Sequence, residues 1–212
     1  MERFARACSK TTHASDGEPG WNNRNVTEKL VKDHYDGNKV GRAVHIMRDP
    51  LDNTVARFHY MMKKLARRGE PETFPLSREG FRAMCVELDE EYAHDVRKSP
   101  SYAEVRDVAT KIPCHTDFFR YVQWHNLAFS TTWELDIPTL VLRYEDYERD
   151  FDGTTTRLHA FLGLEMRNEP PDFIVGKTYR DYFEEEEVDA VRVMVKELAL
   201  KRTWEHMKHY FE

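Results

Sequence analysis

Two short apolar runs stand out from an otherwise polar and heavily charged chain. The first is VGRAVHIM at residues 40–47, which ends at Arg48. The second lies within IPTLVLRYEDY at residues 137–147, where an apolar run follows Pro138. Short apolar runs bounded by turn formers or charges are typical of buried strands. We therefore predict two buried strands.

The stretch after the first run changes to the periodicity of a helix. Asp49 is a favourable N-cap, and Pro50 occupies the first helical position, where its missing N–H costs nothing. Apolar positions then recur as far as Leu65, and Gly69 follows as a stop signal. This pattern predicts a helix from Pro50 to the basic residues before Gly69.

Similar patterns predict further helices along the chain. They cover residues 78–98, 101–111 and 116–134, a segment that ends at Gly163, and a last helix from the acidic run 184–187 to about Tyr210. Residues 1–29 are instead rich in turn formers and predict a flexible N-terminal arm before a domain at 30–212. Two buried strands among many helices predict the α/β class.

The composition limits the classes of function. The chain of 212 residues is long enough for one domain with a core, and its net charge is −6. Because phosphate neutralisation needs an excess of basic residues, this charge argues against a general nucleic-acid binder. No stretch has the roughly 18 apolar residues of a membrane-spanning helix, and no secretory signal is recognisable. As written, the chain is expected in the cytoplasm.

The cysteines and histidines give no strong metal signal. Cys8, Cys85 and Cys114 are far apart and lack the CxxC spacing, so we expect neither a disulfide framework nor a zinc knuckle. His206 and His209 lie one helical turn apart, but no cysteine or carboxylate partner is fixed beside them in sequence. A solvated helix face is the favoured interpretation of this pair, and no metal is expected.

The junction between the first strand and its helix has a chemical meaning. A strand that ends in Arg48 and turns through Asp49 and Pro50 directs a guanidinium and the N–H groups of a helix N-terminus to one point. The planar fork of an arginine donates two hydrogen bonds to one phosphate. The junction therefore predicts an anion site. The alternative is that Arg48 pairs with Asp49, Asp52 or another surface acid.

Several segments resemble one known family. RDPLDNTVARFHY resembles the 3′-phosphate-binding segment of the sulfotransferases that use 3′-phosphoadenosine 5′-phosphosulfate (PAPS). TLVLRYEDYERDFDGTTTRLHAFLGLE is similar to the strand, Tyr-Glu-Asp motif and helix ending Phe-Leu-Gly that lie downstream in the family. LVKDHY at 30–35 and the tail KTYRDYFEEEEVDAV are weaker matches. The resemblance covers residues 30–210 and implies a P-loop-type, three-layer α/β domain with a short parallel sheet flanked by helices.

The resemblance also implies roles for individual residues. Arg48 would bind the 3′-phosphate of the nucleotide, and Tyr144 would lie near the adenine. His34 would be the general base that takes the proton of the acceptor, a task that suits its ordinary pKa of about 6.5. Lys32 would hold the sulfonate. The alternatives are an exposed turn histidine for His34 and a core tyrosine for Tyr144.

The sequence departs from the family pattern at two places. The family has a serine eight residues after the arginine, whereas this chain has Ala56 there, which leaves Thr54 or Arg57 to compensate. The family also opens with a loop that binds the 5′-phosphosulfate, and residues 1–29 contain no such strand and loop. DGTTTRL at 152–158 has a similar composition but follows the Tyr-Glu-Asp motif, so we reject it as that loop. The domain is thus expected to be incomplete at its N-terminus.

These observations lead to hypotheses from different classes. The first is a PAPS-dependent enzyme that transfers a sulfonate to a hydroxyl or amine of a small-molecule or carbohydrate acceptor and releases 3′-phosphoadenosine 5′-phosphate (PAP). The second is a non-catalytic module, derived from such an enzyme, that binds PAP or a protein. A nucleotide kinase is a weaker third hypothesis because kinases depend even more on the missing loop. A location in the Golgi lumen would follow if the chain is an N-terminally truncated form.

Overall fold

The computed structural model describes residues 40–69, 73–168, 173, 176 and 178–212. The strands are β1 (Ala43–Met47) and β2 (Thr139–Arg143). The helices are α3 (Pro50–Arg67), α4 (Arg78–Arg97), α5 (Pro100–Ala109), α6 (His115–Glu134), α7 (Tyr144–Arg149), α8 (Phe151–Leu162), α9 (Glu185–Leu198) and α10 (Lys201–Met207), with 3-10 turns η2 (Arg180–Tyr182) and η3 (Lys208–Tyr210). Among these described helices none is long and apolar enough to cross a membrane.

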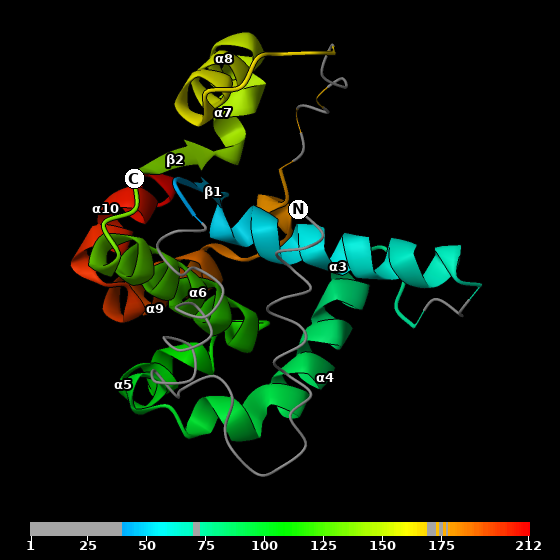
Figure 1. Ribbon diagram of the computed structural model, residues 1–212. Coiled ribbons are helices and arrows are strands. Elements are labelled where there is room, and N and C mark those ends of the chain that lie inside the picture. The colour runs from blue at the N-terminus through cyan, green and yellow to red at the C-terminus, as the bar shows by residue number, and fades with distance from the viewer. Residues whose placement is uncertain (1–39, 70–72, 169–172, 174–175, 177) are drawn as a thin grey trace.

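The two strands form a small parallel sheet at the centre of the fold. Their register runs from Ala43 opposite Thr139 to Met47 opposite Arg143. Figure 1 shows the pair between α7 and α8 on one side and the larger group of helices that contains α3, α6 and α10 on the other. Helices on both faces are usual for a parallel sheet. Burial is only partial here, because His45, Met47 and Leu142 are the buried residues of the two strands and Ile46 is 41% exposed, so the prediction of two buried strands holds in part. The predicted α/β class with a short parallel sheet is confirmed.

Helix α3 begins and packs as its sequence suggests. The Asp49 side chain caps the helix by accepting hydrogen bonds from the N–H groups of Leu51 and Asp52, at 2.8 and 3.3 Å. The buried positions of the helix recur at helical spacing and include Val55 and Phe58. Both side chains have no exposed surface, and a fully buried phenylalanine stabilises a fold by about 2–3 kcal/mol.

The main core lies where α3, α4, α6 and the segment before α9 meet. Phe81 of α4 packs edge to face on Phe58 and on Phe183, with ring centroids 5.8 and 5.6 Å apart. Phe118 of α6 approaches Phe183 from the other side at 6.0 Å. The core therefore joins segments that are far apart in sequence and fixes the middle of α3 relative to the first turn of α6.

Two predicted elements differ from the structure. The second strand is shorter than residues 137–147, because β2 ends at Arg143 and Tyr144 already begins α7. The predicted last helix is not continuous, since α9 ends at Leu198 and α10 begins at Lys201. The buried Asn126 side chain stabilises this break: its amide donates to the Leu198 carbonyl at 2.8 Å and its oxygen accepts from the Leu200 N–H at 2.9 Å.

Candidate functional site

The carboxyl ends of the two strands bring the predicted nucleotide residues together. Because Met47 lies opposite Arg143 in the parallel register, Arg48 and Tyr144 leave the sheet side by side. The Arg48 guanidinium carbon lies 4.5 Å from the centre of the Tyr144 ring. Ligands of open α/β sheets bind beyond the carboxyl ends of the strands, so this pair lies where the fold favours a binding site.

Arg48 has the environment of an anion receptor. Its side chain is half-buried, and its Nε atom is buried without a hydrogen-bond partner. The described residues place no carboxylate oxygen within ion-pair distance of it, although Asp49 and Asp52 are its neighbours in sequence. The alternative in which Arg48 pairs with either acid is therefore not what the structure has. The charge of Arg48 does act on Asp52, where it opposes the rise that burial causes in the pKa of that carboxyl. A half-buried cation that forms no ion pair with a described carboxylate is suited to an anionic ligand.

The helix N-terminus next to Arg48 is already satisfied, which corrects one part of the predicted anion site. The Asp49 side chain takes the N–H groups of Leu51 and Asp52, and the Asn53 N–H donates to the Asp49 carbonyl at 2.8 Å. Pro50 has no N–H. An aspartate at the N-cap thus occupies the donors that would otherwise point to a ligand. The prediction of free N–H groups at this end of α3 was wrong, and the anion site rests on Arg48.

A network of hydrogen bonds fixes the backbone around Arg48. The Tyr121 hydroxyl of α6 donates to the Arg48 carbonyl at 2.6 Å. Glu145 accepts from the Asp49 N–H at 2.9 Å with one oxygen and from the Tyr210 hydroxyl at 3.0 Å with the other. Glu145 was identified in the sequence only as part of the Tyr-Glu-Asp motif. Tyr121 and Tyr210 were not predicted, because nothing in the sequence indicates that α6 and η3 lie against this turn.

The electrostatics of the junction follow from its burial. Burial, and next the charge of Asp52, raises the pKa of the Asp49 carboxyl to about 6. Burial also raises the pKa of Tyr121 and of Tyr210, so both phenols stay protonated and can donate their hydrogen bonds. The two tyrosine donors that hold this turn are therefore fixed near neutral pH, whereas the Asp49 carboxyl titrates close to it.

Aromatic side chains gather beside Tyr144. Phe173 lies 4.9 Å from the Tyr144 ring and is stacked on Tyr147 at 5.7 Å. The same segment of chain is attached to the site at two points: Gly176 donates its N–H to Glu148, and Tyr179 donates its N–H to Asp52, each at 2.7 Å. Phe173 was missed in the sequence because a single aromatic residue after a proline pair carries no motif.

The two residues expected to compensate for Ala56 are engaged within the protein. Thr54 is buried, and its hydroxyl donates to the Pro50 carbonyl one turn earlier at 2.9 Å. Arg57 is paired with the buried carboxylate of Asp117 in the first turn of α6. The structure therefore brings Arg48 and Tyr144 together, whereas Thr54 bonds within α3 and Arg57 is paired with α6.

Other predicted residues have different outcomes. His34 and Lys32 lie outside the described residues, as do the whole of the expected arm at 1–29 and residues 30–39 at the start of the domain. DGTTTRL lies within helix α8, which agrees with its rejection as a phosphate-binding loop. Arg180, the basic residue that follows the KTY segment, forms an exposed ion pair with Glu185 at 3.3 Å.

The histidines pack against aromatic rings. His206 is stacked on Phe129 at 4.9 Å with an angle of 8° between the rings, so the predicted solvated face was wrong for this residue. His45 and His125 are buried around the same phenylalanine, at 4.9 and 6.5 Å. Burial, and next a neighbouring histidine, lowers the pKa of His45 to about 4 and of His125 to about 3. A search of the described residues for groups of three or more metal ligands found none.

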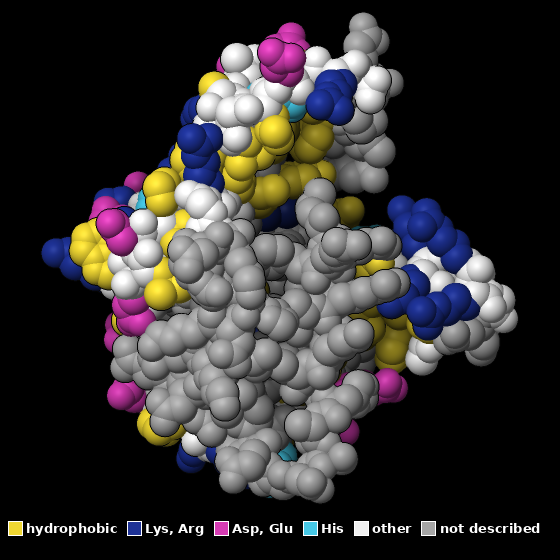
Figure 2. All heavy atoms as spheres, viewed as in Figure 1, with side chains coloured by type: hydrophobic (Ala, Val, Ile, Leu, Met, Phe, Trp, Pro, Cys, Tyr) yellow, Lys and Arg dark blue, Asp and Glu magenta, His cyan; other side chains and the backbone are white. Residues whose placement is uncertain are grey.

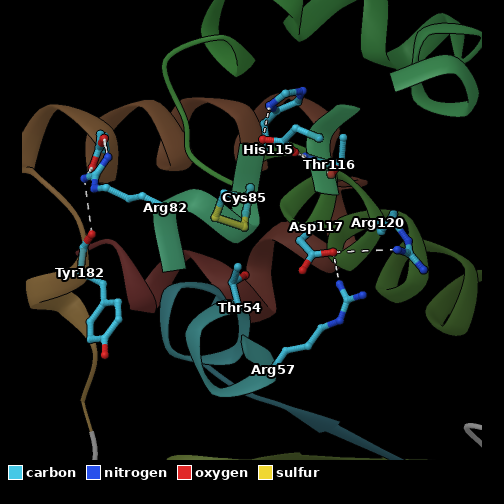
Figure 3. The surroundings of a disulfide bond; sticks show 12 residues. Thr54, Arg57, Arg82, Cys85, His115, Thr116, Asp117, Arg120 and Tyr182 are labelled. Atoms are coloured by element: carbon cyan, nitrogen blue, oxygen red, sulfur yellow. Dashed lines mark hydrogen bonds and ion pairs between the residues drawn. A yellow bond between two sulfur atoms is a disulfide. The ribbon is translucent and has the colours of Figure 1, made fainter. Parts of the chain in front are cut away.

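The structure contains a disulfide bond, which corrects the interpretation of the cysteines. Cys85 of α4 is bonded to Cys114, the residue before α6. Figure 3 shows the bond between Arg82 on one side and His115 on the other. Asp89 supports the same connection, because it accepts from the Thr116 N–H at 3.0 Å and contacts His115 Nδ1 at 3.0 Å. A spacing of 29 residues gave no sign of this pair, since α5 turns the chain back between the cysteines.

Comparison with protein families identifies the group to which this arrangement belongs. The family model of the sulfotransferase domain matches residues 38–211, which is most of the chain. The protein therefore belongs to the sulfotransferase-domain family. No curated protein and no solved structure matches the chain significantly.

Proposed function

We propose that this protein transfers a sulfonate group from PAPS to a hydroxyl or amine of an acceptor, with PAP as the second product. The observation that carries the proposal is the arginine at the carboxyl ends of two parallel strands, half-buried, without a carboxylate partner among the described residues and stacked on Tyr144. Membership of the sulfotransferase-domain family supports the same reaction class.

Arg48 and Tyr144 are the proposed contacts of the nucleotide. The Arg48 guanidinium would bind the 3′-phosphate through paired charge-assisted hydrogen bonds from its terminal N–H groups. Tyr144 and Phe173, with ring centres 4.9 Å apart, would offer flat surfaces to the adenine. The Glu145–Asp49 and Tyr121–Arg48 hydrogen bonds would hold the turn so that the guanidinium needs little rearrangement on binding.

The proposed chemistry is a direct displacement at sulfur. The acceptor oxygen or nitrogen attacks the sulfur atom, a new bond to sulfur forms, and the bond between sulfur and the 5′-phosphate oxygen breaks so that PAP leaves. His34 is the proposed base that removes the proton of the acceptor, and Lys32 is the proposed cation that holds the sulfonate. Both roles come from the resemblance of LVKDHY to the family segment. No metal ion takes part in the proposed reaction.

A second candidate is a non-catalytic module that binds PAP or a protein partner. The occupied hydrogen-bond donors favour it: the helix N-terminus, Thr54 and Arg57 all bond within the protein, and Ala56 stands where the family has a serine. The phosphosulfate-binding loop was also not recognised in the sequence. In this alternative PAP binds at Arg48, but no sulfonate is transferred.

An assay with PAPS separates the two candidates. The purified chain is incubated with PAPS and a panel of phenols, alcohols, amines and oligosaccharides, and PAP release is compared with and without each acceptor. Acceptor-dependent release that is abolished in His34→Ala supports the enzyme. A folded chain that binds PAP but releases none of it from PAPS with any acceptor supports the module.

The disulfide also bears on the compartment. Stable disulfides form in oxidising compartments and are rare in the cytosol. The buried Cys85–Cys114 bond therefore favours the Golgi lumen or another oxidising space over the cytoplasm. The proposed acceptor is a small molecule or a carbohydrate, and nucleic acid is not a proposed partner because the net charge is −6.

A further inference from the structure

A cavity lies away from the strand ends, on the side of the molecule that holds the disulfide. It has a volume of about 810 Å³ and is lined by α4, α5, the connection that follows α5, the first residue of α6, and Glu187 of α9. Cys85 and His115 are part of its wall, so the disulfide fixes two of its sides relative to one another. The volume is within the range of about 300–1,000 Å³ that is usual for small-molecule sites.

The cavity contains charges of both signs, and most of its acids already have partners. Glu187 accepts two hydrogen bonds from Arg82, at 2.8 and 2.7 Å. Asp89 is bonded to His115 and to Thr116. Glu90 is the remaining acid among the described lining residues.

The cations in the cavity are less engaged. Arg97, Arg106 and Lys111 line it from the end of α4, from α5 and from the connection after α5. Their side chains are exposed, and none of them forms an ion pair with another described residue. After the paired groups are set aside, the described lining therefore keeps three cations against Glu90. This excess of positive charge favours an anionic ligand.

The character of the lining narrows the class of ligand. An inorganic anion would fill only a small part of about 810 Å³, whereas a short oligosaccharide would occupy most of it. The carboxylate of Glu90 and the hydroxyl of Thr110 are acceptors for sugar hydroxyls, and the cations match an acidic substituent on the sugar. The exposed Val86 and the half-buried Pro113 add apolar surface for the face of a sugar ring.

We propose that this cavity binds an acidic oligosaccharide, with its sulfate or carboxylate group held by Arg97, Arg106 and Lys111. The site is separate from the strand-end site, and α6 connects the two: His115 lines the cavity, and Tyr121 contacts Arg48. Six residues of helix span about 9 Å along the axis. On the proposed function, the bound sugar is part of an extended acidic carbohydrate acceptor, and the cavity holds the chain away from the sulfonate.

The test measures the binding of a sulfated chondroitin hexasaccharide to the purified chain by calorimetry, with neutral maltohexaose as the comparison sugar. The key variant is Arg106→Ala/Lys111→Ala. The matched control is Lys63→Ala/Lys64→Ala, which removes the same charge from the far end of α3, where Figure 2 shows Lys and Arg side chains gathered away from the cavity. The circular dichroism of all variants is compared with that of the parent chain.

The proposal expects binding of the sulfated sugar that weakens at least tenfold in Arg106→Ala/Lys111→Ala and changes less than twofold in the control. It is overturned if the parent chain does not bind the sulfated sugar, if maltohexaose binds as tightly, or if both double variants lose affinity equally. PAP affinity measured in the same variants should stay unchanged, so failure here is distinguishable from failure of the nucleotide site.

Discussion

Two regions of the molecule use arginine in opposite ways. At the strand ends, Arg48 has no carboxylate partner among the described residues and lies over the Tyr144 ring. At the junction of α3 and α6, about two and a half helical turns further on, Arg57 is paired with the buried Asp117. The resemblance made both of them candidates for the nucleotide. The comparison teaches that Arg57 stabilises the packing of α3 against α6, whereas Arg48 forms no such pair and is left for a ligand.

The largest expected effect is on the stability of the fold around α6, where the disulfide lies. Replacing the disulfide by Cys85→Ala/Cys114→Ala should lower the free energy of unfolding by about 3–4 kcal/mol, the loop-entropy value for cysteines 29 residues apart. Urea denaturation measures this loss. PAP affinity of the folded protein should not change, since the strand-end site lies elsewhere. Equal stability of the two proteins would show that the bond between α4 and the start of α6 does not support the fold.

The next effect distinguishes Arg57 from Arg48 by stability. Arg57→Ala should cost about 2–3 kcal/mol because the Asp117 carboxylate, 6% exposed, keeps Arg120 at 3.9 Å as its remaining cation among the described residues. Arg48→Ala should cost well under that amount, since no buried carboxylate loses its partner. Thermal unfolding of the two variants checks the difference, and similar losses in both would refute the assignment of Arg57 to packing.

Acid should weaken the fold through the buried histidines. The pKa of His45 is about 4 and that of His125 about 3 in the folded protein, against about 6.5 in the unfolded chain. The unfolded state therefore binds more protons below pH 6.5, and stability falls as the pH drops toward 4. Each histidine should contribute a loss of about 2 kcal/mol between pH 7.5 and 5.

Asp49 has the opposite effect on the pH dependence of stability, so the histidine contribution has to be measured separately. Its pKa is raised to about 6, so its contribution to stability is fully present below the unfolded value and is lost as the pH rises through 6. The pH dependence of the wild type's free energy of unfolding is thus the sum of opposing contributions from Asp49 and from the two histidines. Denaturation of His125→Gln at pH 7.5 and 5 isolates the histidine part: the variant should lose less stability on acidification than the wild type. Identical losses would contradict the role of His125.

The smallest expected effect concerns the hydrogen bond between Tyr210 and Glu145. Tyr210→Phe removes a donor from the carboxylate that holds the Asp49 N–H, so it should cost about 1 kcal/mol of stability and weaken PAP binding about threefold. Tyr60→Phe is the control, because Tyr60 is 62% exposed. If both substitutions leave PAP binding unchanged, η3 does not help to position Arg48.

Local chemistry made much of the fold predictable. Asp49 and Pro50 specify where α3 begins, because they supply a cap and a fixed φ angle. Gly163 ends α8 with a φ of +68°, a conformation that favours glycine. The break after Leu198 was not predictable, since it depends on Asn126, a residue of another helix.

The candidate site was predictable only where the motifs are local. Arg48 and Tyr144 could be paired in advance because each follows a strand, and parallel strands end at the same edge. The pairing of Arg57 with Asp117 could not be seen, since it requires α6 to lie against α3. The disulfide was missed for the same reason: its cysteines meet only after α5 has turned the chain back toward α4.

Calorimetric titration with PAP is the most direct test of the central claim, which is that Arg48 at the strand ends binds the 3′-phosphate. The folded wild type should bind PAP with micromolar affinity, and Arg48→Ala should weaken binding by about 1.5–3 kcal/mol, the value of a charge-assisted hydrogen bond. The folded fraction of Arg57→Ala should keep the wild-type affinity. Absence of binding by the folded wild type, or equal losses in the two variants, would contradict the claim.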